Sequence, residues 1–242
     1  AIVIYSAGAN SERCKNDLIH SINTNINQKA LIGKAAVKAG VKKFINISTA
    51  HIYGELNGYI YEDLKSYNVN PYGYTNLIGE LSLNDIARNT DTKIINLRLS
   101  NVFGPPKIDN DHCWKLFVNN ICKEAFINKK ITIKNNHLLE RNFLGLNDFC
   151  KIIEFFIKCE NKKMNFDTYN IGSNESMTLE DMAKIIQLQI SKDFKFKPEI
   201  IYKSEAIRQK KLDFSIARLQ KICKIDYSLN FDIKRLLNLL SN

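Results

Sequence analysis

Residues 44–54 read Phe44-Ile45-Asn46-Ile47-Ser48-Thr49-Ala50-His51-Ile52-Tyr53-Gly54, and residues 71–76 read Pro71-Tyr72-Gly73-Tyr74-Thr75-Asn76. The first stretch opens with an apolar, β-type run, which predicts a buried strand that ends in two hydroxyl residues. The second predicts a helix that opens with a tyrosine. Because open α/β sheets bind ligands beyond the carboxyl ends of their strands, we expect a hydroxyl and a phenol beside one pocket. That pairing indicates oxidoreductase chemistry.

Helices and strands alternate on either side of these stretches, which favours an α/β fold with a parallel sheet. Helical spacing predicts one helix over residues 25–39, closed by Gly40 in a left-handed C-cap, and another over residues 72–87. The expected inward positions are Ala30, Leu31, Ala35 and Val37 in the first helix, and Leu77, Leu81 and Ile86 in the second. Residues 93–99 are predicted to form the next buried strand.

The pattern changes after Pro105-Pro106. We expect a helix near residues 113–126, a short strand at 131–133 and a helix near 149–159. Thr178-Leu179-Glu180-Asp181 has the form of a capping box, and it predicts a helix that continues to about residue 189.

The spacing Ser-Thr-x-x-x-Tyr-Gly over residues 48–54, followed by Pro-Tyr-x-x-x at 71–75, resembles the extended short-chain dehydrogenase/reductases, the NAD-dependent nucleotide-sugar epimerase/dehydratase family. Asn76 stands where that family has lysine. The resemblance implies a partial doubly wound, Rossmann-like parallel sheet with a smaller C-terminal substrate domain. We expect residues 1–105 to be the C-terminal part of the dinucleotide-binding domain. Residues 106–242 are expected to bind substrate, with segments that return to the Rossmann core.

The family's Gly-x-x-Gly-x-x-Gly turn, which holds the cofactor pyrophosphate, does not occur in residues 1–242. The start at Ala1 resembles the fourth strand of the family's fold, and no initiator methionine precedes it. We therefore expect a fragment or truncated chain that lacks the N-terminal Gly-rich half. Its first strand is then expected to have a bare edge.

The resemblance implies that Tyr72 is the catalytic acid/base and that Thr49 orients the reacting oxygen of the substrate. A phenol with a pKa near ~10 must be shifted down to work near neutral pH, and a neighbouring cation favours that shift. In the family, the lysine one helical turn later supplies this cation and holds the nicotinamide ribose. Asn76 keeps a hydrogen bond to the ribose but carries no charge. Three explanations for the missing charge at position 76 stay open. The positive charge of oxidised nicotinamide suffices, another residue helps, or activity is weak or lost.

Two further positions beside Thr49 bear on the reaction. The family's 4,6-dehydratases use an Asp-Glu pair where this chain has Ala50-His51, so dehydration by that route is disfavoured. His51 is either a further acid/base that titrates near neutral pH or a hydrogen-bonded structural histidine. Ser48 is expected to lie beside the cofactor.

Other residues match binding positions of the family. The cofactor-binding set that the resemblance implies is Ala7, Gly8, Asn25, Ser48, Tyr72 and Asn76. Gly8 permits close backbone approach to the cofactor, and Asn25 either supports the cofactor or caps a helix. Asn101 and Arg141 match substrate-binding positions, and the fork of donors on an arginine suits a nucleotide diphosphate.

The resemblance thus implies NAD or NADP as cofactor and a nucleotide-activated sugar as substrate, in polysaccharide biosynthesis. The leading hypothesis is an epimerase or keto-reductase that transfers hydride at a sugar carbon. Two alternatives stand beside it. One is a non-catalytic binding or regulatory relative, which the departure at Asn76 favours, and the other is an inactive truncated fragment.

Composition restricts the partners. The net charge is +10, yet the lysines are scattered and no basic-aromatic motif occurs, so we do not expect nucleic acid as a partner. The six cysteines lack the spacing of a metal site and favour reduced thiols in a cytoplasm. No apolar run approaches the roughly 20 residues that span a bilayer, so no membrane association is expected. A homodimer through a two-helix face follows from the resemblance alone.

Overall fold

The computed structural model describes residues 1–65, 70–108, 112–164 and 167–241. Its main sheet is parallel and has the strand order β1-β2-β4-β8. The strands are β1 (Ile2–Tyr5), β2 (Lys43–Thr49), β4 (Lys93–Leu99) and β8 (Thr168–Ile171). The predicted α/β class with a parallel, Rossmann-like sheet is confirmed. Within the described chain, β1 has a strand neighbour on one side only.

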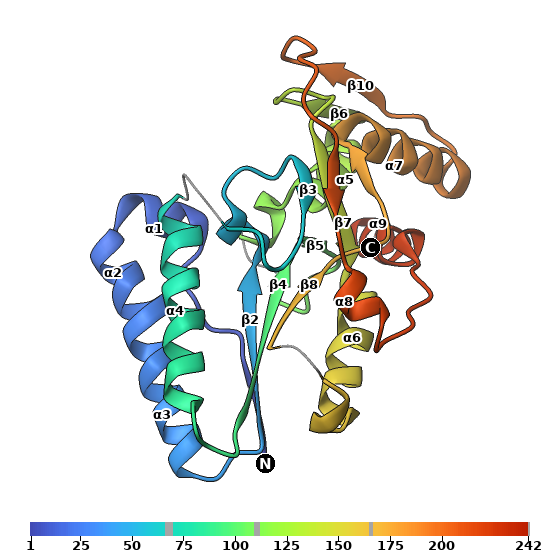
Figure 1. The fold of residues 1–242 in the computed structure, drawn as a ribbon. Coiled ribbons are helices and arrows are strands. Elements are labelled where there is room, and N and C mark those ends of the chain that lie inside the picture. The colour runs from blue at the N-terminus through green and yellow to red at the C-terminus, as the bar shows by residue number, and fades with distance from the viewer. Residues whose placement is uncertain (66–69, 109–111, 165–166, 242) are drawn as a thin grey trace.

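Helices cover the main sheet on both faces (Figure 1). Phe44 and Ile94 point to one face and pack with α3 (Lys29–Lys38) and α4 (Pro71–Ala87). Ile45 and Ile95 point to the opposite face and pack with α6 (Leu146–Lys158). Because successive side chains of a strand face opposite sides, near-continuous apolar runs are what a sheet buried on both faces requires.

The first helical layer begins earlier than the sequence predicts. Two short helices, α1 (Ser11–Asn16) and α2 (Leu18–Ile22), precede a π-helical segment (Asn23–Gln28) that runs directly into α3. Asn25 therefore lies inside a helical segment, and the alternative that it caps a helix is wrong. Gly40 follows α3 with a φ of 67°, so the predicted left-handed position is confirmed.

Three of the predicted inward positions are wrong, because the side chains of Leu31, Ala35 and Leu81 are exposed. Leu31 is 65% exposed and Leu81 is 55% exposed. α3 and α4 instead approach each other at Gly33, where an added Cβ atom would lie 2.5 Å from Cδ2 of Leu83. Such a close crossing needs a residue without a side chain. The glycine therefore faces the partner helix, and the two leucines lie on an apolar outer surface.

Smaller sheets and further helices complete the described chain. β11 (Leu212–Phe214) pairs with β3 (Gly58–Ile60), and β10 (Glu199–Tyr202) pairs with β6 (Lys130–Ile133), both in parallel. β7 (Glu140–Gly145) lies between β5 (Asn101–Phe103), to which it is parallel, and β9 (Ser176–Thr178), to which it is antiparallel. The remaining helices are α5 (Phe117–Asn128), α7 (Leu179–Phe194), α8 (Ala217–Gln220) and α9 (Leu229–Ser241), with 3₁₀ segments at Ala50–Tyr53, Cys113–Lys115 and Asn161–Lys163.

The C-terminal predictions need two corrections. The helix expected over residues 113–126 is interrupted, because Leu116 is extended and separates the 3₁₀ turn from α5. α6 begins at Leu146, earlier than predicted. The capping box is confirmed, since Thr178 and Asp181 each accept a hydrogen bond from the other's backbone N–H at the start of α7. Over the part of the chain that the structure describes, no helix has the length and apolar character that crossing a membrane requires.

Candidate functional site

A pocket of about 780 Å³ lies beyond the carboxyl ends of β1, β2 and β4. Its walls come from the loop after β1, the segment after β2 with the start of α4, the end of β4 with β5, residues 112–118, and β7. Nine of the ten residues predicted for the site line it: Ala7, Gly8, Ser48, Thr49, His51, Tyr72, Asn76, Asn101 and Arg141. Asn25 is outside the lining. The pocket occupies the position at which open parallel sheets bind their ligands.

Tyr72 lies in the first turn of α4, at the pocket wall. Pro71 begins the helix, and the Asn70 side chain caps it by accepting a hydrogen bond from the Gly73 N–H at 3.0 Å. Burial raises the pKa of Tyr72, whereas a hydrogen bond with Thr49 acts in the opposite direction. The described chain therefore does not itself produce the lowered phenol pKa that acid/base chemistry needs.

Thr49 ends β2 and is nearly buried. Its Oγ1 accepts a hydrogen bond from the His51 N–H at 3.2 Å, which caps the short 3₁₀ segment that follows. The same hydroxyl is within hydrogen-bonding reach of Tyr72. The two predicted catalytic hydroxyl groups therefore share one wall of the pocket.

His51 lies next to this pair. Its ring is edge-on to the Tyr72 ring, with the centroids 5.7 Å apart. Burial and the positive charge of Arg141 lower the pKa of His51 from its usual 6.5, so the imidazole is neutral at pH 7. Within the described chain, neither ring nitrogen has a hydrogen-bond partner, which leaves one donor and one acceptor available to a ligand.

Asn25 supports the pocket from behind. Its Oδ1 accepts a hydrogen bond from the Ala9 N–H at 2.8 Å, and its Nδ2 donates to Oγ1 of Thr75 at 2.9 Å. These bonds fasten the loop after β1 to α4. An added Cβ atom at Gly8 would lie 3.3 Å from the Asn25 oxygen, so the glycine lets this loop lie close to the helix.

Arg141 brings an available positive charge to the pocket. Its guanidinium lies 6.0 Å from the Phe117 ring centroid, and burial lowers its pKa. Among the residues that the structure describes, it has no hydrogen-bond acceptor or carboxylate partner. A guanidinium held in this way is suited to a phosphate or carboxylate ligand. Asn101 lines the same pocket and is fixed by a hydrogen bond from its Nδ2 to the Asn142 carbonyl at 3.1 Å.

Two buried hydroxyls in the pocket also have no partner in the described chain, those of Ser48 and Ser100. Buried polar groups are normally hydrogen-bonded, so an orphaned pair in a pocket indicates that a polar ligand completes them. Ser48 was predicted for the cofactor side of the site. Ser100 was missed, although it directly follows the predicted strand that ends at Leu99.

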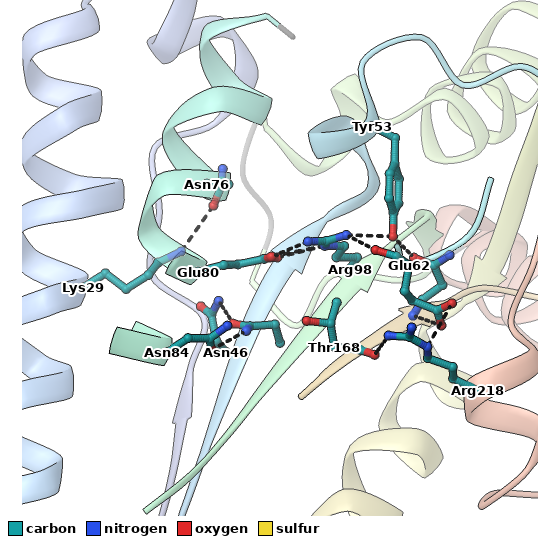
Figure 2. Close-up of polar contacts among 12 residues, drawn as sticks. Lys29, Asn46, Tyr53, Glu62, Asn76, Glu80, Asn84, Arg98, Thr168 and Arg218 are labelled. Atoms are coloured by element: carbon teal, nitrogen blue, oxygen red, sulfur yellow. Dashed lines mark hydrogen bonds and ion pairs between the residues drawn. The ribbon is translucent and has the colours of Figure 1, made fainter. Parts of the chain in front are cut away.

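A buried lysine that the sequence did not predict for the site lies beside Asn76. Lys29 Nζ donates a hydrogen bond to Oδ1 of Asn76 at 3.3 Å (Figure 2). Lys29 is 1% exposed, and burial lowers its pKa to about 8. One sequence signal was present, because Lys29 follows Asn25 by four residues and residues so spaced share one face of a helix.

Residues 1–172, well over half of the chain, match the NAD dependent epimerase/dehydratase family. The chain belongs to this family. Among curated members, it is 30% identical over 166 residues to the dTDP-D-glucose 4,6-dehydratase of Mus musculus. It is 26% identical over 200 residues to the UDP-glucose 4-epimerase of Mycoplasma genitalium. These matches cover 68% and 73% of this chain, but 44% and 58% of those proteins. This family member thus spans about half the length of the curated relatives that it matches.

Solved structures share the fold of this epimerase/dehydratase family member. One is the UDP-glucuronic acid 4-epimerase from Bacillus cereus in complex with UDP-glucuronic acid and NAD, with a TM-score of 0.78 and 20% identity. Another is RMD from Pseudomonas aeruginosa complexed with NADPH, with a TM-score of 0.82 and 16% identity. Both matches cover 99% of this chain, and they cover 75% and 80% of those chains.

Proposed function

We propose that the protein is an NAD(P)-dependent epimerase or keto-reductase that acts on a nucleotide-activated sugar. The observation that carries the proposal is the meeting of Thr49 and Tyr72 at one wall of the pocket. The guanidinium of Arg141, which has no acceptor among the described residues, lies in the same pocket. A reacting sugar and its diphosphate need those two kinds of group, one near the carbon–oxygen bond and one near the phosphates.

The residues of the pocket fit a dinucleotide cofactor. Ala7 and Gly8 provide a loop of small residues, and the orphaned hydroxyl of Ser48 lies beside them in the lining. Asn76 offers an amide at the same wall. Membership of the epimerase/dehydratase family supports the assignment, as do the similar solved structures, which are complexes with NAD and NADPH. Bound there, NAD or NADP would accept or supply the hydride.

Within this proposal each side chain has a defined task. Tyr72 exchanges a proton with the sugar hydroxyl or carbonyl oxygen, and Thr49 orients that oxygen by hydrogen bonding. Burial raises the phenol pKa, so Tyr72 holds its proton at neutral pH, and a positive charge placed directly beside the ring, such as that of oxidised nicotinamide, would favour the phenolate. Arg141 binds the diphosphate, and Asn101 contributes an amide to the same substrate region.

Ala50 and His51 favour epimerisation or reduction over dehydration. Elimination of water needs a second acid and base near the sugar, and this segment brings no carboxylate. The neutral imidazole of His51 is the one ionisable group that the segment brings to the pocket. The match to a 4,6-dehydratase therefore supports the family but not that reaction.

A non-catalytic binding relative is the second candidate. It is favoured by the absence of a cation at position 76 and by the raised pKa of Tyr72. Such a protein would bind a dinucleotide and a nucleotide sugar without turnover, so binding and turnover must be measured separately.

Tyr72→Phe in the full-length polypeptide tests the proposal. We expect the turnover of UDP- or dTDP-hexoses, measured by NMR of the products, to fall by about a thousandfold, the middle of the range for loss of a positioned acid/base. The NAD(P) dissociation constant should change little. Tyr74→Phe is the matched control, because Tyr74 lies on the same helix with its side chain 53% exposed. Undiminished turnover in Tyr72→Phe would refute the catalytic assignment, and binding without turnover in the parent protein would favour the second candidate.

A further inference from the structure

Lys29 is a buried cation that the proposed chemistry does not yet use. It begins α3, is 1% exposed, and reaches α4, where its Nζ lies 3.3 Å from Oδ1 of Asn76. Its ammonium also lies 5.8 Å from the centroid of the Tyr5 ring. Figure 2 shows the Lys29 side chain extended from its helix toward Asn76, with Glu80 one turn further along α4.

The ammonium is poorly paired for such a buried charge. Within the described chain, Asn76 is its one hydrogen-bond acceptor, although an ammonium has three donors. Glu80 attracts it, but both oxygens of that carboxylate already accept hydrogen bonds from Arg98. Buried lysines are rarely left in this state, because an incompletely paired charge costs stability. A role in the site would account for its retention.

α4 has room for this lysine. An added Cβ atom at Gly79 would lie 3.0 Å from Cδ and 3.2 Å from Nζ of Lys29. It would also lie 2.4 Å from the backbone oxygen of Asn25. The glycine therefore permits the close approach of the two helices and leaves a path for the lysine stem to Asn76.

Asn76 is held at both ends of its amide. Oδ1 accepts the hydrogen bond from Lys29, and Nδ2 donates to the Tyr72 carbonyl at 2.9 Å. Asn76 also lines the pocket, whereas Lys29 lies behind it. One N–H and one lone pair of the amide remain for a ligand, and Lys29 helps to fix the direction in which they point.

We propose that Lys29 is a positioning residue of the pocket: from α3 it holds Asn76 and supplies the positive charge that α4 lacks at position 76. The inference rests on the proposed function, since it assigns Lys29 to the binding of the dinucleotide. Lys29 acts through Asn76 and does not touch the pocket itself. The cation that the family resemblance implies on α4 lies, in this chain, on α3.

The proposal predicts a pH dependence of cofactor binding. Burial lowers the pKa of Lys29 to about 8, and the charge of Glu80 opposes that effect. The other ionisable groups on this side include Tyr5 on β1, whose pKa burial raises, and Arg98 on β4, which is paired with Glu80. Tyr72 on α4, whose pKa burial also raises, and Cys14 on α1, which contacts Asn25, lie in the same layer. Lys29 is thus the group expected to lose its charge as the pH rises through about 8, and dinucleotide affinity should fall over that interval.

The experiment exchanges the two side chains in the full-length polypeptide. Dissociation constants for NAD, NADH, NADP and NADPH are measured by fluorescence between pH 6.5 and 9.5. The variants are Lys29→Met, Asn76→Lys, and the exchange Lys29→Asn with Asn76→Lys. Each single variant should weaken binding about tenfold, within the range of coupling found for side chains in contact. Asn76→Lys does so because it brings a second ammonium beside Lys29. The exchange variant, which restores one cation and one amide, should recover most of the loss.

Lys34→Met is the matched control, because Lys34 lies on the same helix and is exposed. It should bind as the parent protein does. In Lys29→Met the fall in affinity near pH 8 should disappear, which a loss of packing alone would not produce. Circular dichroism identifies any variant that fails to fold.

The outcomes separate the two proposals. A parent protein that binds no dinucleotide refutes the proposed function, and this inference with it. A parent that binds and turns over, together with a Lys29→Met variant of equal affinity and an unchanged pH profile, refutes the inference alone. Failure of the exchange variant to recover binding, when it folds normally, also contradicts it.

Discussion

The guanidinium of Arg98, on β4, donates hydrogen bonds to both carboxylate oxygens of Glu80, on α4, the shortest at 2.8 Å. Arg98 also donates to the Tyr53 hydroxyl at 3.0 Å, and Tyr53 donates to Oδ1 of Asn170 at 2.6 Å. This chain of polar contacts runs from α4 across the sheet to β8 (Figure 2). It connects the helix that carries Tyr72 to the C-terminal half of the protein.

Glu80→Gln should destabilise the protein by about 3–5 kcal/mol, because removal of one charge leaves the Arg98 guanidinium buried and uncompensated. The measurement is the free energy of unfolding in urea. Asp85→Asn, on the same helix, is the control, since the Asp85–Arg88 pair is exposed and such pairs contribute little. Equal effects of the two substitutions would contradict the assignment of the buried pair.

Lys29→Met should stabilise the fold at pH 7 while it weakens cofactor binding. The pKa of Lys29 falls from 10.5 to about 8 on folding, so its buried charge penalises the folded state by up to about 3 kcal/mol at 1.36 kcal/mol per pKa unit. Below pH 8 Lys29 is protonated in both the folded and the unfolded state, so the full cost of burying its charge applies. Between pH 8 and 10.5 the unfolded chain binds more protons, so the parent protein gains stability as the pH rises.

The advantage of Lys29→Met should therefore be largest at pH 7 and shrink toward pH 10. Urea unfolding at both pH values measures it, with Lys34→Met as the control that shows no such trend. The net gain in the free energy of unfolding will be smaller than the full cost of burying the charge, because the variant also loses the hydrogen bond to Asn76. A loss of stability at both pH values would show that attraction between Lys29 and Glu80 outweighs the cost of burial.

Arg141→Gln should raise the pKa of His51. Burial is the larger cause of the lowered value and remains, but the repulsion from the guanidinium is removed. NMR of the imidazole protons over pH 4.5–8.5 follows the titration, with the signals of His20 and His137 as references outside this pocket. An unchanged His51 titration would mean that Arg141 does not act on it.

The same shift has a consequence for stability. The pKa of His51 is lower in the folded state than in the unfolded state, so the unfolded chain binds more protons below pH 6.5. The stability that depends on neutral His51 is present above pH 6.5 and is lost as the pH falls through the folded-state pKa. Arg141→Gln should reduce that acid sensitivity.

The homodimer through a two-helix face stays a prediction. The outer surface of α3 and α4 carries the exposed side chains of Leu31 and Leu81, which a partner subunit would cover. Leu81→Lys should convert a dimer to a monomer in analytical ultracentrifugation without loss of fold. Leu188→Lys is the control, because Leu188 is 67% exposed on the distant helix α7. A dimer that persists in Leu81→Lys would place the interface elsewhere.

Most of the sheet could be predicted from the sequence because its signals are local. The strand predicted over residues 93–99 is β4 itself, since a short, mostly apolar run with β-branched residues is typical of a strand buried on both faces. The capping box of Thr178 and Asp181 and the left-handed Gly40 likewise depend on neighbouring residues alone. Ser48 and Thr49 could be placed in the pocket because they end a predicted strand. Most of the other pocket residues, including Asn76, Asn101 and Arg141, were predicted from the resemblance to the family.

The relation between α3 and α4 could not be predicted, because it depends on contacts between distant residues. Leu31 and Leu81 have the spacing of buried positions, yet the helices meet through Gly33 instead. The burial of Lys29 could not be predicted either, because a lysine on a helix is normally solvated. Only the combination of Gly79, which leaves space, and Asn76, which accepts a hydrogen bond, makes burial of that side chain feasible.

The contact between Lys29 and Asn76 joins positions 47 residues apart in the chain. A genetic crossover between the two codons, with a relative that has lysine at position 76 and no lysine at position 29, would leave one recombinant with two facing ammonium groups and the other with none. Neither product would inherit a working pair. The two codons therefore form a single unit of inheritance, and breakpoints for recombined or engineered hybrids of this protein belong before α3 or after α4.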